Sequence, residues 1–184
     1  SYDEKKAANY IKNHFIETNT KSAFEDTGYF QKFPVDVLDF SKVELYFNKT
    51  KLTFIDDFYP YGNPTNNSYK NTPIVNVGYG IKTKERNDYL GKNTKGKVVF
   101  IKQGLPTYDN VDKKEGNWRR KVQTATKKGA VAIVFLKSDY ANTDLRIKEY
   151  LKNPFMQLHG NQKSKPQPPV FIVDEDKIKA LNQD

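Results

Sequence analysis

Two apolar stretches, GKVVFI at residues 96–101 and GAVAIVFL at residues 129–136, decide the fold. Each is a short, continuous apolar run, which is typical of a strand that is buried on both faces of a sheet. Between them, Trp118, Val122 and Ala125 fall on one face of a predicted helix. Strand, loop, helix and strand in this order form a βαβ unit, so we expect two neighbouring parallel strands.

Further strands and helices are predicted on both sides of this unit. After it, VFIV at residues 170–173 reads as a strand, and Asp174 is placed to cap a final helix. Before it, IVNV at residues 74–77 predicts another strand, whereas the Pro-, Gly- and Asn-containing residues 56–71 predict a loop. Residues 43–47 and 52–55 alternate as the two strands of a hairpin, with a turn at residues 48–51.

The N-terminal segment adds a helix and a strand. Ala7, Ile11 and Phe15 share one helical face. Residues 29–35 predict a strand that either lies at an edge or ends at Pro34, which lacks an N–H donor. We therefore expect an α/β (α+β) fold. Its centre is a β-sheet or open barrel flanked by a few helices, and a helix–strand extension precedes it.

Composition excludes several classes of protein. The 184 residues correspond to one domain, or to one domain with an appended piece. The absence of cysteine excludes disulfide scaffolds, thiolate metal sites and thiol catalysis. The longest apolar stretch, residues 130–136, is far shorter than the about 20 residues that span a bilayer. The net charge of +9 comes mostly from dispersed lysines, which argues against sequence-specific nucleic-acid binding.

No catalytic set is visible in the sequence. His14 and His159 lack partners at metal-ligand spacing, and there is no G-x-S-x-G elbow. Gly78-Tyr79-Gly80 follows a predicted strand but lacks the third glycine of a dinucleotide loop. The residues alone therefore favour a binding or accessory module, with no catalytic and no metal-binding residue in this chain.

The order of pieces between Gly96 and Val173 carries a family resemblance. Gly96-Lys97-Val98-Val99-Phe100-Ile101, then Lys121 and Ala125, then Gly129 to Val134, and finally Pro168 to Val173 resemble the protease-associated (PA) domain. The flanking segments, Ala7 to Phe15, Tyr29 to Val35 and Val75 to Ile81, resemble M28-type zinc aminopeptidases with an inserted PA domain. The resemblance implies a peptidase-domain start at residues 1–47 and a PA domain at residues 48–184.

The resemblance also implies a function. This chain would be the non-catalytic PA domain of a secreted M28-type zinc aminopeptidase, a hydrolase, acting in substrate access, substrate positioning or protein interaction. No cofactor is expected in this chain, and zinc is expected in the catalytic domain after residue 184. The implied partners are a peptide or protein substrate and that catalytic domain. The implied location is secreted, periplasmic or at the cell surface, with no membrane span.

Two alternatives stay open at the level of sequence. One is a free-standing basic domain that binds an anionic polymer, either glycan or nucleic acid. The other concerns the loop from Gly104 to Trp118, which is longer than a strand–helix connection requires. It is either a plain surface loop or a substrate or partner element, and its candidate contact residues are Tyr108, Asp109, Asp112, Lys113 and Lys114.

Overall fold

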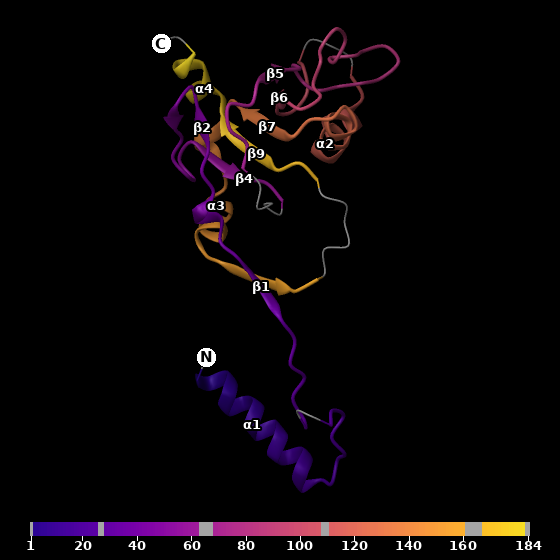
Figure 1. Ribbon diagram of the computed structural model, residues 1–184, viewed down its shortest axis with the longest axis vertical. Helices are drawn as coiled ribbons and strands as arrows, with labels where there is room; N and C mark the ends of the chain where they lie inside the picture. Colours follow the sequence, from indigo (N-terminus) through magenta and orange to yellow (C-terminus); the bar gives the residue numbers. More distant parts are fainter. Residues whose placement is uncertain (1, 26–27, 63–67, 108–110, 161–166, 183–184) are drawn as a thin grey trace. The chain divides into compact units, whose positions relative to one another are not determined.

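The computed structural model describes residues 2–25, 28–62, 68–107, 111–160 and 167–182. These residues form two compact units (Figure 1). Unit 1 comprises residues 1–37 and 156–162, and unit 2 comprises residues 38–155 and 163–184. Within these ranges the elements belong to the predicted α/β (α+β) class, with four α-helices and a mixed sheet.

The centre of unit 2 is a five-stranded sheet in the order β4-β9-β7-β6-β5. Its strands are β4 (Phe58–Pro60), β5 (Ile74–Asn76), β6 (Val98–Lys102), β7 (Ala132–Lys137) and β9 (Val170–Asp174). The predicted parallel pair is confirmed, because β6 pairs with β7 in parallel. Strands β5 and β9 extend the parallel part, whereas β4 runs antiparallel to β9. Among the described residues this sheet stays open and does not close into a barrel.

Helices cover both faces of this sheet because successive strand residues point to opposite sides. On one face, Val99 and Ile133 pack with Val122 and Ala125 of α2 (Trp118–Lys127). On the other face, residues such as Val134 and Val173 pack with the helix α4 (Glu175–Leu181). The predicted cap of α4 is confirmed, since the Asp174 side chain accepts a hydrogen bond from the Asp176 amide at 2.9 Å.

The hairpin forms, but its second strand lies at residues 50–51, within the predicted turn, and not at residues 52–55 as predicted. Strands β2 (Tyr46–Phe47) and β3 (Thr50–Lys51) pair antiparallel. The turn consists of Asn48 and Lys49 alone, both at positive φ, as a tight two-residue turn requires. The prediction of one loop over residues 56–71 was wrong at its start. Strand β4 lies there and is buried. Its backbone can leave water because β4 pairs with β9, which supplies hydrogen-bond partners.

Unit 1 contains α1 (Tyr2–Glu17) and most of a two-stranded ribbon of β1 (Val35–Leu38) and β8 (Phe155–Leu158). The helix prediction is confirmed. The predicted strand at residues 29–35 is misplaced, because a strand forms only where a partner lies alongside it, and β8 pairs from residue 35 onward. The Pro34 carbonyl closes this pairing by accepting from the His159 amide at 3.0 Å.

The remaining elements are short. The helix α3 (Leu145–Lys152) belongs to unit 2, as do the 3-10 turns η1 (Phe40–Lys42), η2 (Lys113–Gly116) and η3 (Tyr140–Asn142). Asp144 caps α3 by accepting a hydrogen bond from the Arg146 amide at 2.8 Å. In the described part of the chain, no helix combines the length and the apolar character that a bilayer crossing needs.

Candidate functional site

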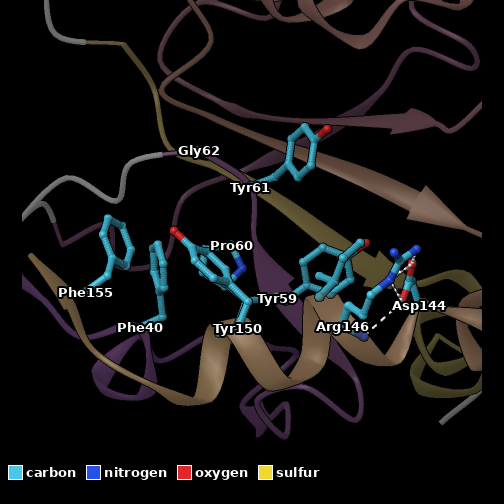
Figure 2. Close-up of a pocket in the computed structure, with 11 residues that line it drawn as sticks. Phe40, Tyr59, Pro60, Tyr61, Gly62, Asp144, Arg146, Tyr150 and Phe155 are labelled. Atoms are coloured by element: carbon cyan, nitrogen blue, oxygen red, sulfur yellow. Dashed lines mark hydrogen bonds and ion pairs between the residues drawn. The ribbon is translucent and has the colours of Figure 1, made fainter.

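An open groove of about 560 Å³ lies in unit 2 between the end of β4 and the helix α3 (Figure 2). Its lining includes aromatic residues from four separate elements or their flanks, namely Phe40, Tyr59, Tyr61, Tyr150 and Phe155. The volume falls within the range of about 300–1,000 Å³ that is usual for ligand sites. The groove is therefore the candidate binding site of this unit.

The aromatic side chains of the groove hold one another in place. The Phe155 ring lies 5.2 Å from that of Phe40 and 5.6 Å from that of Tyr150, centroid to centroid. Beneath the groove, the Tyr59 ring lies 5.8 Å from that of Tyr140, whose hydroxyl donates to the Ile55 carbonyl at 3.0 Å. Burial raises the pKa of Tyr140, so its hydroxyl stays protonated as a donor.

One end of the groove carries charge. The Arg146 guanidinium contacts the Asp144 carboxylate, with its Nη2 atom 2.7 Å from Oδ2 and its Nε atom 3.2 Å from both oxygens (Figure 2). Hydrogen bonds from Arg146 lower the pKa of Asp144, so this carboxyl is ionised at neutral pH. The groove thus runs from the ring of Phe155 to an exposed ion pair.

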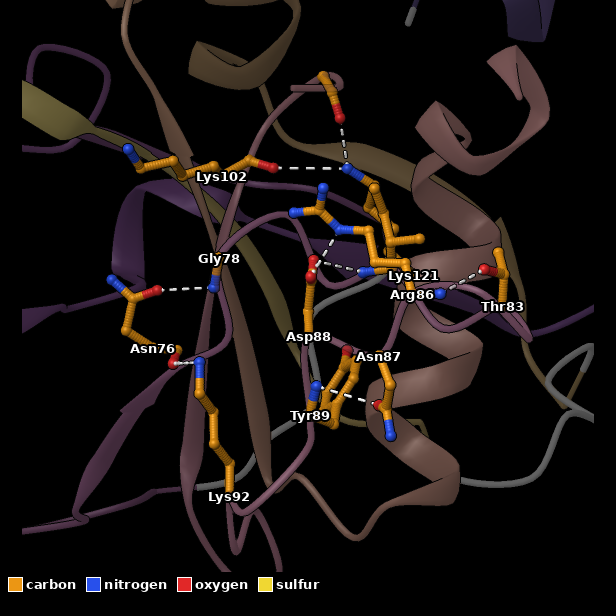
Figure 3. A network of polar contacts seen from close by, with 12 residues as sticks. Asn76, Gly78, Thr83, Arg86, Asn87, Asp88, Tyr89, Lys92, Lys102 and Lys121 are labelled. Carbon is orange, nitrogen blue, oxygen red and sulfur yellow. Dashed lines mark hydrogen bonds and ion pairs between the residues drawn. The ribbon is translucent and has the colours of Figure 1, made fainter. Parts of the chain in front are cut away.

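A second polar region surrounds Lys121 of α2 (Figure 3). Its side chain is buried, and its Nζ donates to the Gly104 carbonyl at 2.5 Å and lies 3.5 Å from that of Lys102. Burial lowers the pKa of Lys121 to about 8. The two acceptors, the carbonyls of Lys102 and Gly104, lie at the end of β6 and just after it. Lys121 therefore connects the start of the β6–α2 loop to the helix α2.

Neighbouring charges in Figure 3 fix the loop that follows β5. The Arg86 Nε lies 2.7 Å from Asp88 Oδ1, and the other oxygen of Asp88 accepts from the Ile81 amide at 3.0 Å. The Lys92 Nζ donates to the Asn76 carbonyl at 2.8 Å, at the outer edge of β5. The charged groups of Arg86, Asp88 and Lys92 thus find hydrogen-bond partners within this region, which is typical of a structural network.

The predicted substrate loop is only partly within the described residues. Tyr108 and Asp109 lie outside them. Asp112 caps η2 by accepting from the Lys114 amide at 2.9 Å, and it pairs with Lys114 Nζ at 2.7 Å. Lys113 is exposed beside them. Asp112, Lys113 and Lys114 do not line the groove. Their role in substrate or partner contact stays a prediction.

The two histidines have different surroundings. His14 lies on the exposed helix α1. His159 Nδ1 lies 2.8 Å from Asp36 Oδ1, and this carboxylate raises the pKa of His159. Within the described ranges, no three His, Cys, Asp or Glu side chains come together in a way that could hold a metal ion. The described residues therefore do not offer zinc a ligand set.

Sequence reasoning missed the groove because its walls come from segments without predicted elements. Helix α3 carried a readable signal: Asp144 is a good N-cap, and Ile147, Tyr150 and Leu151 follow at helical spacing. Tyr59 and Pro60 carried no such signal, because a proline considered by itself indicates a turn. Phe40 and Phe155 are single aromatics that only the folded chain brings together.

Comparison with known proteins gave matches among solved structures alone. The chain matches no protein family and no curated protein. It is similar to an aminopeptidase from Aneurinibacillus sp. strain AM-1, with 22% identity and a TM-score of 0.46 over 100% of this chain and 35% of that one. It is also similar to BSAP, a zinc aminopeptidase from Bacillus subtilis, with 18% identity and a TM-score of 0.44 over 100% and 36%. The chain spans about a third of the length of these bacterial enzymes.

Proposed function

We propose that this chain is the protease-associated accessory region of a secreted M28-type zinc aminopeptidase, joined to the start of its peptidase domain. In this proposal the chain is not itself catalytic, and the zinc ligands lie in another part of the enzyme. Residues 48–184 form the accessory domain, which positions or admits the peptide substrate. The resemblance of residues 96–136 and 168–173 to the PA domain supports this assignment.

One structural observation carries the proposal: the ribbon of β1 and β8 exposes its apolar side chains. The exposed fractions of the four side chains lie between 42% and 71%, for Val35, Val37, Met156 and Leu158. The residues that alternate with them are half-buried. A ribbon with water on one side normally directs polar residues outward. The reversed pattern marks a surface that another part of the protein covers.

Helix α1 has the same property. It has no buried residue along its sixteen, although Ile11, Phe15 and Ile16 give it apolar surface. Phe15 stacks on Tyr29, and the Lys12 ammonium lies over the Phe30 ring at 5.8 Å, so these contacts join α1 to residues 29–30 of the same unit. In proteins most of the stability of a helix comes from the packing of its apolar face and not from its own propensity. We infer that α1 and the ribbon pack against the peptidase part.

The test compares the same substitutions in two contexts. Val37→Asp and Met156→Lys are introduced into the 184-residue chain and into the complete parent protein. In the chain alone we expect changes in unfolding free energy within about 0.5 kcal/mol, because both side chains are exposed there. In the parent protein each should cost about 2 kcal/mol or more, because a charge would enter a covered apolar surface.

Leu90→Asp is the matched control, since Leu90 is an exposed apolar residue that belongs to unit 2 and to neither strand of the ribbon. It should leave the unfolding free energy unchanged both in the 184-residue chain and in the parent protein. Equal, small effects of all three substitutions in the parent protein would contradict the proposal, as would a parent protein without a zinc peptidase domain.

A further inference from the structure

We propose that the groove of unit 2 binds an extended peptide that carries an apolar anchor side chain and, a short distance along, a carboxylate. This inference goes beyond the proposed function, because it needs only residues of this chain and no peptidase domain. The anchor would enter between the aromatic walls, and the carboxylate would meet Arg146.

The aromatic end of the groove is built to take an apolar side chain. The Phe155 ring packs against both Tyr150 and Phe40, so the side chains of this wall have little freedom (Figure 2). Tyr150 remains 57% exposed and Ile147 38% exposed. An anchor that covers them would gain about 25 cal/mol per Å² of apolar surface removed from water. Little is lost to ordering, because the rings are already held.

The chemistry of the lining favours a peptide over a sugar. Most of the groove surface is carbon, and its charged groups are confined to Asp144 and Arg146 at one end. A sugar ring brings several hydroxyls, and each one buried without a partner costs about 1–3 kcal/mol. A peptide can instead insert a single apolar side chain and keep its polar backbone toward the open side.

Charge complementarity selects an acidic peptide. Together with its N-cap, helix α3 carries Arg146, Lys148 and Lys152 against Asp144 and Glu149, an excess of one positive charge. The Arg146 side chain is 91% exposed, and Asp144 holds it through Nε and Nη2. Within the described residues its Nη1 has no hydrogen-bond partner, so it is available to a second carboxylate. That carboxylate comes either from an Asp or Glu side chain or from a peptide C-terminus.

Calorimetric titration of the 184-residue chain with three hexapeptides tests the proposal and separates the two carboxylate sources. The first is amidated and has Phe and Glu two residues apart, the second replaces Glu by Gln, and the third is the Gln peptide with a free C-terminus. We expect the amidated Gln peptide to bind at least fivefold more weakly than the Glu peptide. If the third peptide matches the first, the C-terminal carboxylate serves as well.

Two groove variants and one control locate the site. Tyr150→Ala should weaken binding of the Glu peptide at least tenfold, and Arg146→Gln should make the chain indifferent between Glu and Gln peptides. Tyr46→Ala, at another exposed tyrosine in β2, should leave all affinities unchanged. Arg146→Gln should keep the thermal midpoint of the parent chain, because the Arg146 side chain is exposed. Tyr150→Ala should lower the midpoint slightly, because it loses the stacking on Phe155, and a cooperative unfolding transition would show that this variant is still folded.

Three results would overturn the inference. The first is no saturable binding of any of the peptides at millimolar concentration. The second is binding that Tyr150→Ala leaves intact, which would place the peptide elsewhere. The third is tight binding of heparin or of a neutral oligosaccharide by a chain that does not bind the peptides. That result would make the groove a glycan site instead. None of these outcomes bears on whether the chain belongs to a peptidase.

Discussion

Tyr61 and Trp118 meet edge to face, with ring centroids 4.6 Å apart and ring planes at 79°. The contact joins the end of β4 to the first turn of α2, and the Arg119 guanidinium lies over the same Trp118 ring at 4.6 Å. Tyr61 also lines the groove. Because Trp118 is the single tryptophan, its fluorescence reports on one wall of the groove.

Tyr61→Ala should therefore shift the Trp118 emission to longer wavelength and lower stability. The edge-to-face pair contributes about 0.5–1.5 kcal/mol beyond the area that it buries. Emission spectra and urea denaturation of the 184-residue chain check both effects, with Tyr46→Ala as the tyrosine control. An unchanged emission maximum in Tyr61→Ala would show that the two rings do not meet in solution.

Gly129 should tolerate alanine less well than Gly91 does. Both have positive φ, at +81° and +70°, which costs an alanine about 1–2 kcal/mol. At Gly129 a Cβ atom would in addition lie 3.2 Å from the backbone Cα of Lys95, whereas the space at Gly91 is open. In urea denaturation, the unfolding free energy of Gly129→Ala should be lower than that of Gly91→Ala by at least about 1 kcal/mol. Equal losses would contradict the close packing of the α2–β7 turn.

Lys121 should make the chain more stable as pH rises above neutrality. Burial lowers its pKa to about 8, whereas in the unfolded chain its ordinary value is 10.5. Between these two values the unfolded state binds more protons, so unfolding free energy increases with pH in this window. The difference in unfolding free energy between the chain and Lys121→Met, measured from pH 7 to pH 10, should follow this rise. Parallel curves for the two proteins would contradict a buried, charged Lys121.

His159 should titrate above the ordinary histidine value because of Asp36. The hydrogen bond and charge of Asp36 raise the pKa of His159. The protonated pair therefore strengthens the β1–β8 ribbon below pH 6.5, and this contribution is lost as pH rises through the folded pKa. Imidazole chemical shifts followed by NMR should show the midpoint falling in Asp36→Asn. An identical midpoint in both proteins would show that the pair is not formed.

The sequence predicted the centre of the fold well, for a physical reason. The runs that became β6, β7 and β9 are continuous and apolar because both faces of these strands are buried, so each could be recognised by itself. Strand β4 could not be recognised, since Phe58 to Pro60 becomes a strand only through its pairing with β9, far along the chain. The ends of β1 depend on β8 in the same way.

The candidate site was less accessible to sequence reasoning. The length of the loop after β6 drew attention to Asp112 and Lys114, which pair with each other at the cap of η2. The groove instead assembles from Phe40, Tyr59 and Tyr150, which lie far apart in the sequence and resemble ordinary core residues when taken singly. Distant aromatics carry no local pattern, so only the folded chain brings them to one place.

The central claim, that unit 1 is a surface for a larger peptidase, is tested most directly by amide hydrogen exchange. The 184-residue chain and the complete parent protein are compared at the same pH and temperature. We predict that amides of α1 and of the β1–β8 ribbon exchange rapidly in the chain alone and become at least tenfold more protected in the parent protein. The amides of β6 and β7 should be strongly protected in both. Equal, rapid exchange of α1 and the ribbon in the two proteins would contradict the claim.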